Sequence, residues 1–407
     1  MAGVDLGKQV AECRSGVGLH GLVPDAGVAG TKQNRWLRWH HQQMVDWLRL
    51  GADMEDLATQ ALRAGKQATG RLRPTVIQPY RGFIADGVAN TRARVMEQPI
   101  FDVVPGGLRI DATLAANLLR WVVLDIAGLE VTVTIGDQSV TVNSDQNGFV
   151  IAKIPVGDIE PGWHEVQYSA THQGREVTAR GRAVLPDPAS PLGFITDIDD
   201  TILATGMTEG LKAVQRILLR DPYGRKPVPG TPSLYRGLAR GTGRTRPEST
   251  FFYVSAAPWN LYDMHAQFLG VRGFPRGPIF LRDWRPGDPR RDEGGSLSAA
   301  YKRARIRRIL DAYPDLTFVL IGDSGEHDAE VYQEFLDSDP DRILVAFIRD
   351  VTAKNPVLDS DDPDVLPDTS ALVVVRDSIQ MARIAQRLGL IDSLTVDEVI
   401  TEIDARV

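Results

Sequence analysis

Apolar and polar residues follow three different patterns along the chain, and each pattern predicts a different kind of structure. Between residues 34 and 63, apolar residues recur at about every 3.6 positions, which is typical of an amphipathic helix. From 75 to 185 the period is two, as expected for short, half-buried strands. Beyond 191, short apolar runs alternate with helical segments, which predicts a mostly parallel sheet with helices on both faces.

The segments with a period of two lie close together and are separated by turns. Short strands with regular turns favour a small antiparallel β-sandwich, and a helical insertion is expected at Leu114–Leu124. The clearest alternating segments are Thr91–Val95, Val131–Ile135, Val166–Ala170 and Val177–Leu185.

In the last zone, five apolar runs are expected to be buried strands and five longer segments to be helices. The strands are Leu192–Thr196, Thr250–Val254, Leu316–Ile321, Ile343–Ile348 and Ala371–Val375. The helices are Gly210–Arg220, Trp259–Leu269, Ala300–Tyr313, Asp328–Leu336 and Asp377–Leu388.

Three prolines within Pro186–Pro191 mark a boundary between two domains. We therefore expect a leader with the amphipathic helix at 1–72 and the β-sandwich at 73–187. The α/β domain would occupy 188–391, and a helical tail would follow at 392–407.

Composition narrows the function classes. The 407 residues are 43% hydrophobic and 24% charged, as in a globular protein, and the net charge of −7 argues against a nucleic-acid binder. No apolar run is long enough for a transmembrane helix, and the first residues lack the pattern of a secretory signal. A single cysteine, Cys13, fits a reducing compartment, so the expected location is the cytoplasm.

Candidate chemistry begins where the first strand of the last zone ends. Asp197, Asp199 and Asp200 follow the apolar run within four residues. The carboxyl ends of parallel strands face the crevice where α/β proteins bind ligands, and clustered carboxylates there favour a bound cation. One carboxylate could attack phosphorus while its neighbour handles the proton of the leaving group. An Asp-rich turn or a helix N-cap would produce the same pattern without any chemistry.

Further polar residues stand at comparable positions. Asp323 follows another strand and could complete a metal site of oxygen ligands with Asp197, which suits magnesium rather than zinc. Ser255 follows a strand and could hold a phosphate oxygen, and Lys302, one of eight lysines, could neutralise it. Taken singly, each could equally be an ordinary turn or surface residue.

The order of these motifs resembles the four-motif set of the haloacid dehalogenase superfamily. Within it, three segments resemble the actin-patch-protein type of phosphatidate phosphatase: Asp-Ile-Asp-Asp-Thr-Ile at 197–202, Phe-Tyr-Val-Ser-x-x-Pro-Trp-Asn-Leu at 252–261 and Ile-Gly-Asp-Ser-Gly-Glu at 321–326. Shorter matches include Pro-Tyr-Arg-Gly at 79–82 and Ile-Arg-Asp-Val at 348–351. The resemblance covers about residues 75–391.

This resemblance implies a haloacid-dehalogenase-like fold and a magnesium-dependent hydrolysis of phosphatidate to diacylglycerol and phosphate through an aspartyl-phosphate. Asp197 would be the nucleophile and a magnesium ligand. Asp199 would be the general acid and then base, and would offer the metal its backbone carbonyl. The supporting residues would be Thr201 and Ser255, which steady the phosphoryl group; Lys302, which neutralises it; and Asp323 and Asp328, which complete the metal site.

The sequence departs from the family pattern at two places. Ala256 and Ala257 stand where further hydroxyls are expected after Ser255, and Tyr301 precedes Lys302 where a histidine is common. Contacts around the phosphate could be fewer as a result, and a second cation could be absent.

The substrate is the less determined part of the interpretation. A soluble phosphomonoesterase, or a membrane- or protein-binding module with little catalysis, remains an alternative. A phospholipid at a membrane surface is the expected partner, and Trp36, Trp39 and Trp47 make the helix at 34–63 a candidate for peripheral attachment. The same helix could instead cap the sandwich. The sequence does not indicate an oligomeric state.

Overall fold

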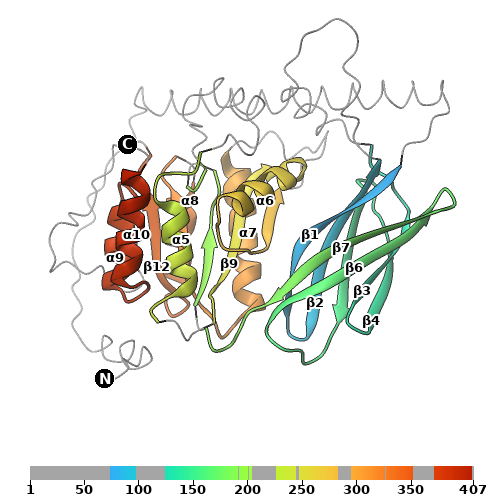
Figure 1. Ribbon diagram of the computed structural model, residues 1–407, viewed down its shortest axis with the longest axis horizontal. Helices are drawn as coiled ribbons and strands as arrows, with labels where there is room; N and C mark the ends of the chain where they lie inside the picture. The colour runs from blue at the N-terminus through green and yellow to red at the C-terminus, as the bar shows by residue number, and fades with distance from the viewer. Residues whose placement is uncertain are drawn as a thin grey trace, which may run out of the picture. The chain divides into compact units, whose positions relative to one another are not determined.

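The computed structural model describes residues 74–97, 124–190, 192–199, 201–203, 226–243, 247–282, 295–325, 327–351 and 371–405. All of them fall within one compact unit of the chain, in which two sheets follow one another in sequence (Figure 1). Three predicted helices, at 34–63, at 114–124 apart from Leu124, and at 210–220, lie outside the described residues.

The first sheet, sheet A, has seven strands in the order β4-β3-β6-β7-β1-β2-β5. Every pairing is antiparallel except that of β1 with β7. The alternation that predicted strands is confirmed: in β3, Val131, Val133 and Ile135 are buried while Thr132 and Thr134 are only half-buried. The strands are β1 (Thr75–Ala85), β2 (Val88–Glu97), β3 (Glu130–Ile135), β4 (Gln138–Asn143), β5 (Phe149–Pro155), β6 (Gly162–His172) and β7 (Arg175–Leu185).

One apolar core belongs to this sheet. It combines inward-facing residues of β2, β3, β5 and β6, such as Val95, Val133, Ile154 and Tyr168. Because the hydrogen-bonded ladder is continuous across all seven strands, the predicted sandwich of two sheets is not confirmed.

The second sheet, sheet B, has six strands in the order β10-β9-β8-β11-β12-β13, and all of its pairings are parallel. This confirms the predicted α/β class with a parallel sheet. The carboxyl ends of the strands meet at one edge, with β8 in the interior of the sheet. The strands are β8 (Leu192–Thr196), β9 (Thr250–Pro258), β10 (Ile279–Arg282), β11 (Thr317–Asp323), β12 (Ile343–Arg349) and β13 (Ala371–Val375).

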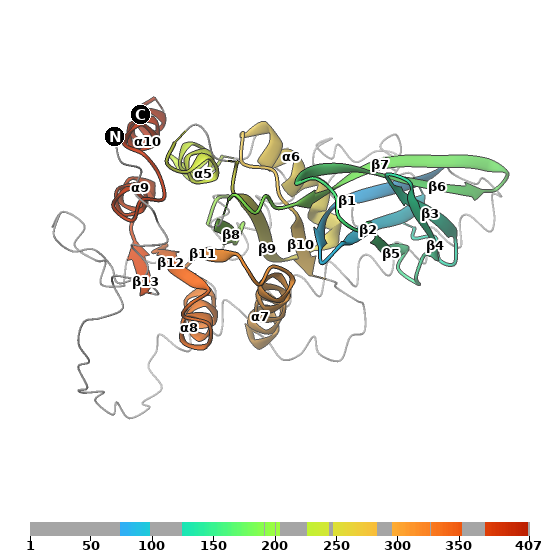
Figure 2. The ribbon, with the colours of Figure 1, turned by 90° about the horizontal axis from the view of Figure 1, so that it is seen from below.

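Helices cover both faces of sheet B, as predicted (Figure 2). One face packs against α5, α6, α9 and α10, and the other against α7 and α8. The helices are α5 (Thr231–Arg240), α6 (Tyr262–Val271), α7 (Gly295–Ala312), α8 (Asp328–Ser338), α9 (Ser378–Arg387) and α10 (Ser393–Asp404), with the 3-10 turn η4 (Trp259–Leu261) before α6.

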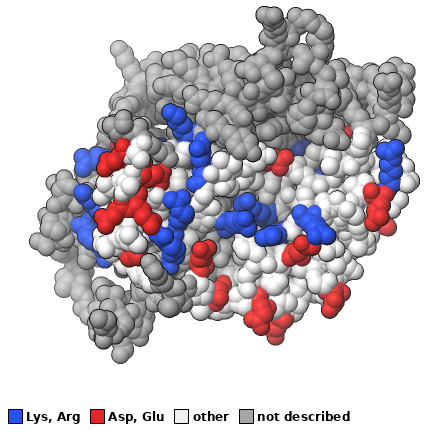
Figure 3. All heavy atoms as spheres, viewed as in Figure 1, with Lys and Arg blue, Asp and Glu red and all other residues white. Residues whose placement is uncertain are grey.

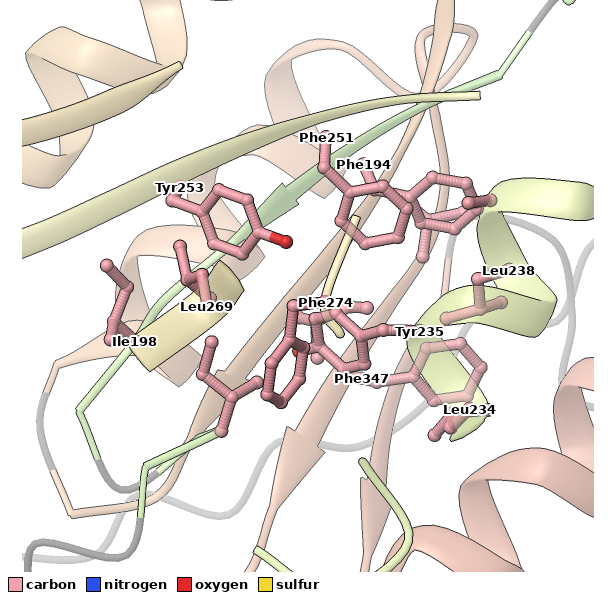
Figure 4. Close-up of a cluster of buried hydrophobic side chains, with 14 of the residues drawn as sticks. Phe194, Ile198, Leu234, Tyr235, Leu238, Phe251, Tyr253, Leu269, Phe274 and Phe347 are labelled. Atoms are coloured by element: carbon pink, nitrogen blue, oxygen red, sulfur yellow. The ribbon is translucent and has the colours of Figure 1, made fainter. Parts of the chain in front are cut away.

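Aromatic packing holds α5 against the sheet. The rings of Phe194 and Phe251 stack with centroids 4.6 Å apart, and Tyr235 of α5 lies beside Phe251 at 5.4 Å (Figure 4). α10 in turn lies close to α5, since a Cβ placed on Gly237 would be only 2.0 Å from Cγ2 of Thr395.

In sheet B, β9 and β11 extend two or more residues beyond their predicted ends, and both extensions carry polar residues. β9 continues past Val254 to Pro258, because its later part pairs with β10 after an irregularity in register. β11 continues to Asp323, which pairs with Arg349 of β12. Ser255 and Asp323 therefore belong to the strands themselves and not to the loops that follow them.

Candidate active site

Asp197 follows directly on β8, between the ends of β9 and β11. Its backbone N–H donates to the carbonyl of Ile321 at 2.9 Å, so the ladder continues one residue beyond the strand. The preceding side chain, Thr196, points to the opposite face, where its hydroxyl lies 2.8 Å from the hydroxyl of Tyr235. The backbone of Asp197 is thus held by β11, and its side chain is only 2% exposed.

Three carboxylates gather around this position. Asp197, Asp323 and Asp328 each offer an oxygen within 4.8 Å of the others, and all three side chains are buried. They come from the ends of β8 and β11 and from the first residue of α8. The structure thus brings together three of the predicted metal ligands, from positions as far apart in sequence as 197 and 328.

Lys302 of α7 supplies the positive charge of this cluster. Its Nζ lies 3.0 Å from Oδ1 of Asp197 and 2.5 Å from Oδ1 of Asp328, and its side chain is 2% exposed. A buried ammonium in this position offsets part of the repulsion between the carboxylates and holds two of them in a fixed relation.

Thr201 lies on the other side of Asp197. Its hydroxyl is 3.3 Å from Oδ2 of Asp197 and 3.3 Å from Oδ2 of Asp323. The two oxygens of Asp197 therefore have different neighbours, a cation on one side and a hydroxyl on the other.

Asp199 occupies a separate part of the site. Its side chain is half-buried, and its Oδ2 accepts a hydrogen bond from Ser255 at 2.9 Å. The Ser255 oxygen also accepts from the backbone N–H of Ala257 at 3.0 Å. Asp199 and Ser255, both predicted site residues, thus form a pair across the ends of β8 and β9.

The turn after β11 depends on close approaches that only glycine allows. A Cβ on Gly322, the second-last residue of β11, would lie 2.5 Å from Oδ2 of Asp328, and a Cβ on Gly325 would lie 2.9 Å from Oδ1 of Asp323. The backbone N–H of Gly325 donates to the same Asp323 oxygen at 2.6 Å. The turn is tied to the end of β12, since the Ser324 hydroxyl donates to Asp350 at 3.0 Å. The Ile-Arg-Asp-Val segment therefore supports the turn that directly follows Asp323.

This group of residues fits a metal ion by its donor set. Three buried carboxylates face one ammonium, and burial makes the excess negative charge unfavourable unless a cation or protons balance it. Oxygen donors alone suit a hard divalent cation rather than zinc or copper. Asp197, Asp323 and Asp328 could hold such an ion.

Buried tyrosines behind the site were not predicted. Tyr235 contacts Thr196, and the Tyr332 hydroxyl donates to the carbonyl of Ile321 at 3.0 Å. Burial raises the pKa of both phenols, and the neighbouring carboxylates add to the shift, so both hydroxyls remain neutral. A single tyrosine in a helical segment carries no sequence signal for this role.

At both departures from the family pattern, the residue present makes a hydrogen bond in the structure. Tyr301, where a histidine is common, donates its hydroxyl to the carbonyl of Leu281 at 2.7 Å and so holds β10. Ala257 contributes a backbone N–H to Ser255 in place of a hydroxyl.

Comparison with known proteins places this geometry in context. Residues 192–350, which carry all seven predicted site residues, match the family described as "Phosphatidate phosphatase APP1, catalytic domain". The chain is 31% identical over 189 residues to "Phosphatidate phosphatase APP1" of Saccharomyces cerevisiae, which is 45% of this chain and 30% of the yeast protein. It is 32% identical over 167 residues to an uncharacterised protein of Schizosaccharomyces pombe, covering 39% and 25% of the two chains. The chain thus spans less than a third of the length of either relative.

Solved structures add little. A β-glucuronidase of Parabacteroides merdae matches with 10% identity and a TM-score of 0.22, over 68% of this chain and 34% of that one. A TM-score this low carries no argument about fold or function.

Proposed function

We propose that this chain hydrolyses a phosphomonoester and that its substrate is phosphatidate, because residues 192–350 match the family described as "Phosphatidate phosphatase APP1, catalytic domain". The products would be diacylglycerol and inorganic phosphate. The observation that carries the proposal is the buried cluster in which Asp197 and Lys302 meet Asp323 and Asp328 at the carboxyl edge of the sheet.

The proposed fold family is that of the haloacid dehalogenases. Its support is the placement of four motifs, three on sheet B and one on a helix that packs against it: Asp197 after β8, Ser255 in β9, Asp323 at the end of β11, and Lys302 on α7. The strand order puts β8 between β9 and β11, so the nucleophile lies between the two strands that carry its partners.

Asp197 is the proposed nucleophile. An oxygen of its carboxylate attacks phosphorus, the bond from phosphorus to the ester oxygen breaks, and an aspartyl-phosphate forms. Lys302 and Thr201 hold the carboxylate in one orientation before the reaction, which reduces the entropy that the attack would otherwise cost. Lys302 also offsets the charge of the phosphoryl group.

Asp199 is the proposed acid and base. In the first step it gives a proton to the departing alkoxide of diacylglycerol, and in the second it takes one from the water that attacks the aspartyl-phosphate. Its bond to Ser255 fixes the carboxyl group on one side, and its partial exposure leaves a route for that water. Ser255 and Thr201 are the proposed contacts to the phosphoryl oxygens.

The proposed cofactor is magnesium, held by Asp197, Asp323 and Asp328 together with the backbone carbonyl of Asp199. The ion would supply positive charge next to the phosphoryl oxygens, where charge accumulates in the transition state. The three buried carboxylates and Lys302 leave a net negative charge, so a cation of this kind would favour the binding of a phosphate dianion.

A lipid substrate requires contact with a membrane surface. No helix in the part of the chain that the structure describes is long and apolar enough to cross a bilayer. On the face drawn in Figure 3, both basic and acidic side chains lie among the described residues. The segment at 34–63, with Trp36, Trp39 and Trp47, lies outside the described residues and stays the proposed site of peripheral attachment. The cytoplasm is the proposed location.

The test is phosphate release by the purified full chain. Phosphatidate in mixed micelles is compared with a panel of soluble phosphomonoesters, each with magnesium, with calcium and with excess chelator. The proposal expects the highest kcat/KM on phosphatidate, activity with magnesium and almost none with chelator or calcium, because calcium's longer, looser coordination would misplace the carboxylate. A preference for a soluble ester would favour the alternative of a small-molecule phosphomonoesterase. Full activity in chelator would contradict the metal site.

A further inference from the structure

The turn that follows Ser255 is held by sheet A rather than by sheet B alone. This turn comprises Pro258 and the 3-10 turn η4, and it connects β9 to α6. Nη1 of Arg94, in β2, donates to the side-chain oxygen of Asn260 at 2.6 Å. The other edge of the same guanidinium is bound to Asp125 through Nε at 2.8 Å and Nη2 at 2.9 Å. Because Arg94 is buried and paired with Asp125 on two atoms, its third donor points at Asn260 in a fixed direction.

A second contact from sheet A holds Trp259. The guanidinium of Arg92 lies 4.3 Å from the centre of the Trp259 ring and 4.0 Å from that of Phe149, so the cation lies against two aromatic rings. The ring of Tyr80 lies 4.6 Å from Trp259. Trp259 is buried, so these contacts replace water on the indole.

A third contact joins sheet A to α6 at an irregularity in β1. The register between β1 and β2 shifts between Tyr80 and Phe83, at the Pro-Tyr-Arg-Gly segment. The backbone N–H of Arg81 is directed out of this pairing and donates to the hydroxyl of Tyr262, the first residue of α6, at 2.8 Å. Sheet A thus contacts three of four successive residues, 259, 260 and 262.

The turn is linked to the catalytic pair by two residues. Ser255 donates to Asp199 while it accepts from the N–H of Ala257. Between Ala257 and Trp259 stands only Pro258, whose ring restricts its φ, here −72°. A shift of Trp259 therefore moves the Ala257 N–H and, with it, the hydroxyl that holds Asp199.

We propose that sheet A is a positioning element of the active site: Arg92 and Arg94 fix the turn at 258–261 and thereby keep Ser255 on the carboxylate of Asp199. The proposal rests on the acid and base role proposed above for Asp199. Neither arginine touches the substrate, and both act through the turn. Full catalytic rate would then require sheet A as well as sheet B.

The experiment changes Asn260, which leaves the buried Arg94–Asp125 pair intact. Asn260→Ala removes the acceptor for Arg94, whereas Asn260→Asp keeps an oxygen there. Asn90→Ala is the matched control, because Asn90 of β2 also accepts from an arginine across the two sheets, Arg308 of α7 at 3.4 Å, but that contact does not reach the turn. For each full-length variant, the first-step rate is measured in single-turnover bursts on an alkyl phosphate and on an activated aryl phosphate, together with KM and Tm.

The expected result depends on the leaving group. Asn260→Ala should lower the rate on the alkyl phosphate by about tenfold and the rate on the aryl phosphate much less, because only the alkoxide needs a proton from a well-placed acid. KM should change little, Asn260→Asp should restore the alkyl rate, and Asn90→Ala should match the parent.

Equal losses on both substrates, or an Asn260→Ala variant that matches the parent, would overturn the proposal and leave sheet A as a structural neighbour only. An inactive parent would instead contradict the proposed function, so the two failures are distinguishable.

Discussion

At the scale of single residues, the site separates two carboxylates by environment. Asp197 is buried between Lys302 and Thr201, whereas Asp199 is half-buried and bonded to Ser255. A cation beside a carboxylate favours its charged form, and a partly exposed carboxylate can exchange protons with water. This difference is what two separate roles, nucleophile and proton carrier, require.

Asp199→Asn tests that division of roles. The amide cannot donate a proton in place of the acid, so an alkyl phosphate with its poor leaving group should lose roughly two orders of magnitude in first-step rate. An activated aryl phosphate should lose much less. The rates are measured in single-turnover bursts on both substrates. Ser255→Ala is measured in the same way, so that loss of the acid can be separated from loss of the hydrogen bond that holds it. Equal losses on the two substrates in Asp199→Asn would show that Asp199 does not protonate the leaving group.

At the scale of elements, the site depends on how closely β11 and α8 approach. Gly322→Ala should displace Asp328, since the added Cβ would lie 2.5 Å from its Oδ2 and 2.8 Å from its Cβ. Asp328 also holds Lys302, so kcat should fall by about tenfold or more. Gly270→Ala is the matched control, because a Cβ at Gly270, in α6, meets nothing within 4 Å. If kcat and Tm of the two variants were alike, the close approach would not matter to the site.

The sequence predicted those elements whose pattern is local. β8 and β13 have the predicted bounds, and α7 to α9 lie within a few residues of prediction, because apolar spacing reports burial directly. α5 and β10 were not predicted: Thr231–Arg240 contains Gly237, which disfavours a helix and which packing against α10 outweighs, whereas Pro232 lies in the first turn, where proline is tolerated. At the site, the strand ends predicted Asp197 and Asp323. The bonds of Arg94 to Asn260 and of Ser324 to Asp350 join distant segments and leave no local pattern.

At the scale of the whole molecule, seven buried tyrosines among the described residues couple stability to alkaline pH. Burial raises the pKa of each, to about 12 for Tyr262 from an ordinary value of 10.0. Those with a raised pKa are Tyr80, Tyr168, Tyr235, Tyr253, Tyr262, Tyr313 and Tyr332. Between the unfolded and folded pKa values, the unfolded chain binds fewer protons than the native one, so the free energy of unfolding falls as pH rises.

The stabilisation should therefore be complete below pH of about 10 and be lost progressively as pH rises through about 12. Urea unfolding followed from neutral to alkaline pH measures this slope. Tyr262→Phe should make the decline shallower while lowering stability at neutral pH, because the Arg81 N–H loses its acceptor. A free energy of unfolding that stays constant across this range would contradict burial of these hydroxyls.

The central claim, that Asp197 carries the phosphoryl group, is tested most directly by trapping the intermediate. The full-length parent and Asp197→Asn are mixed with phosphatidate labelled in its phosphate, quenched in acid within one turnover, and the denatured protein is counted and mapped. We predict label on the parent that hydroxylamine removes and that maps to the peptide containing Asp197, with none on Asp197→Asn and turnover reduced by about three orders of magnitude or more. An active parent that never becomes labelled, or equal label on Asp197→Asn, would contradict the covalent mechanism.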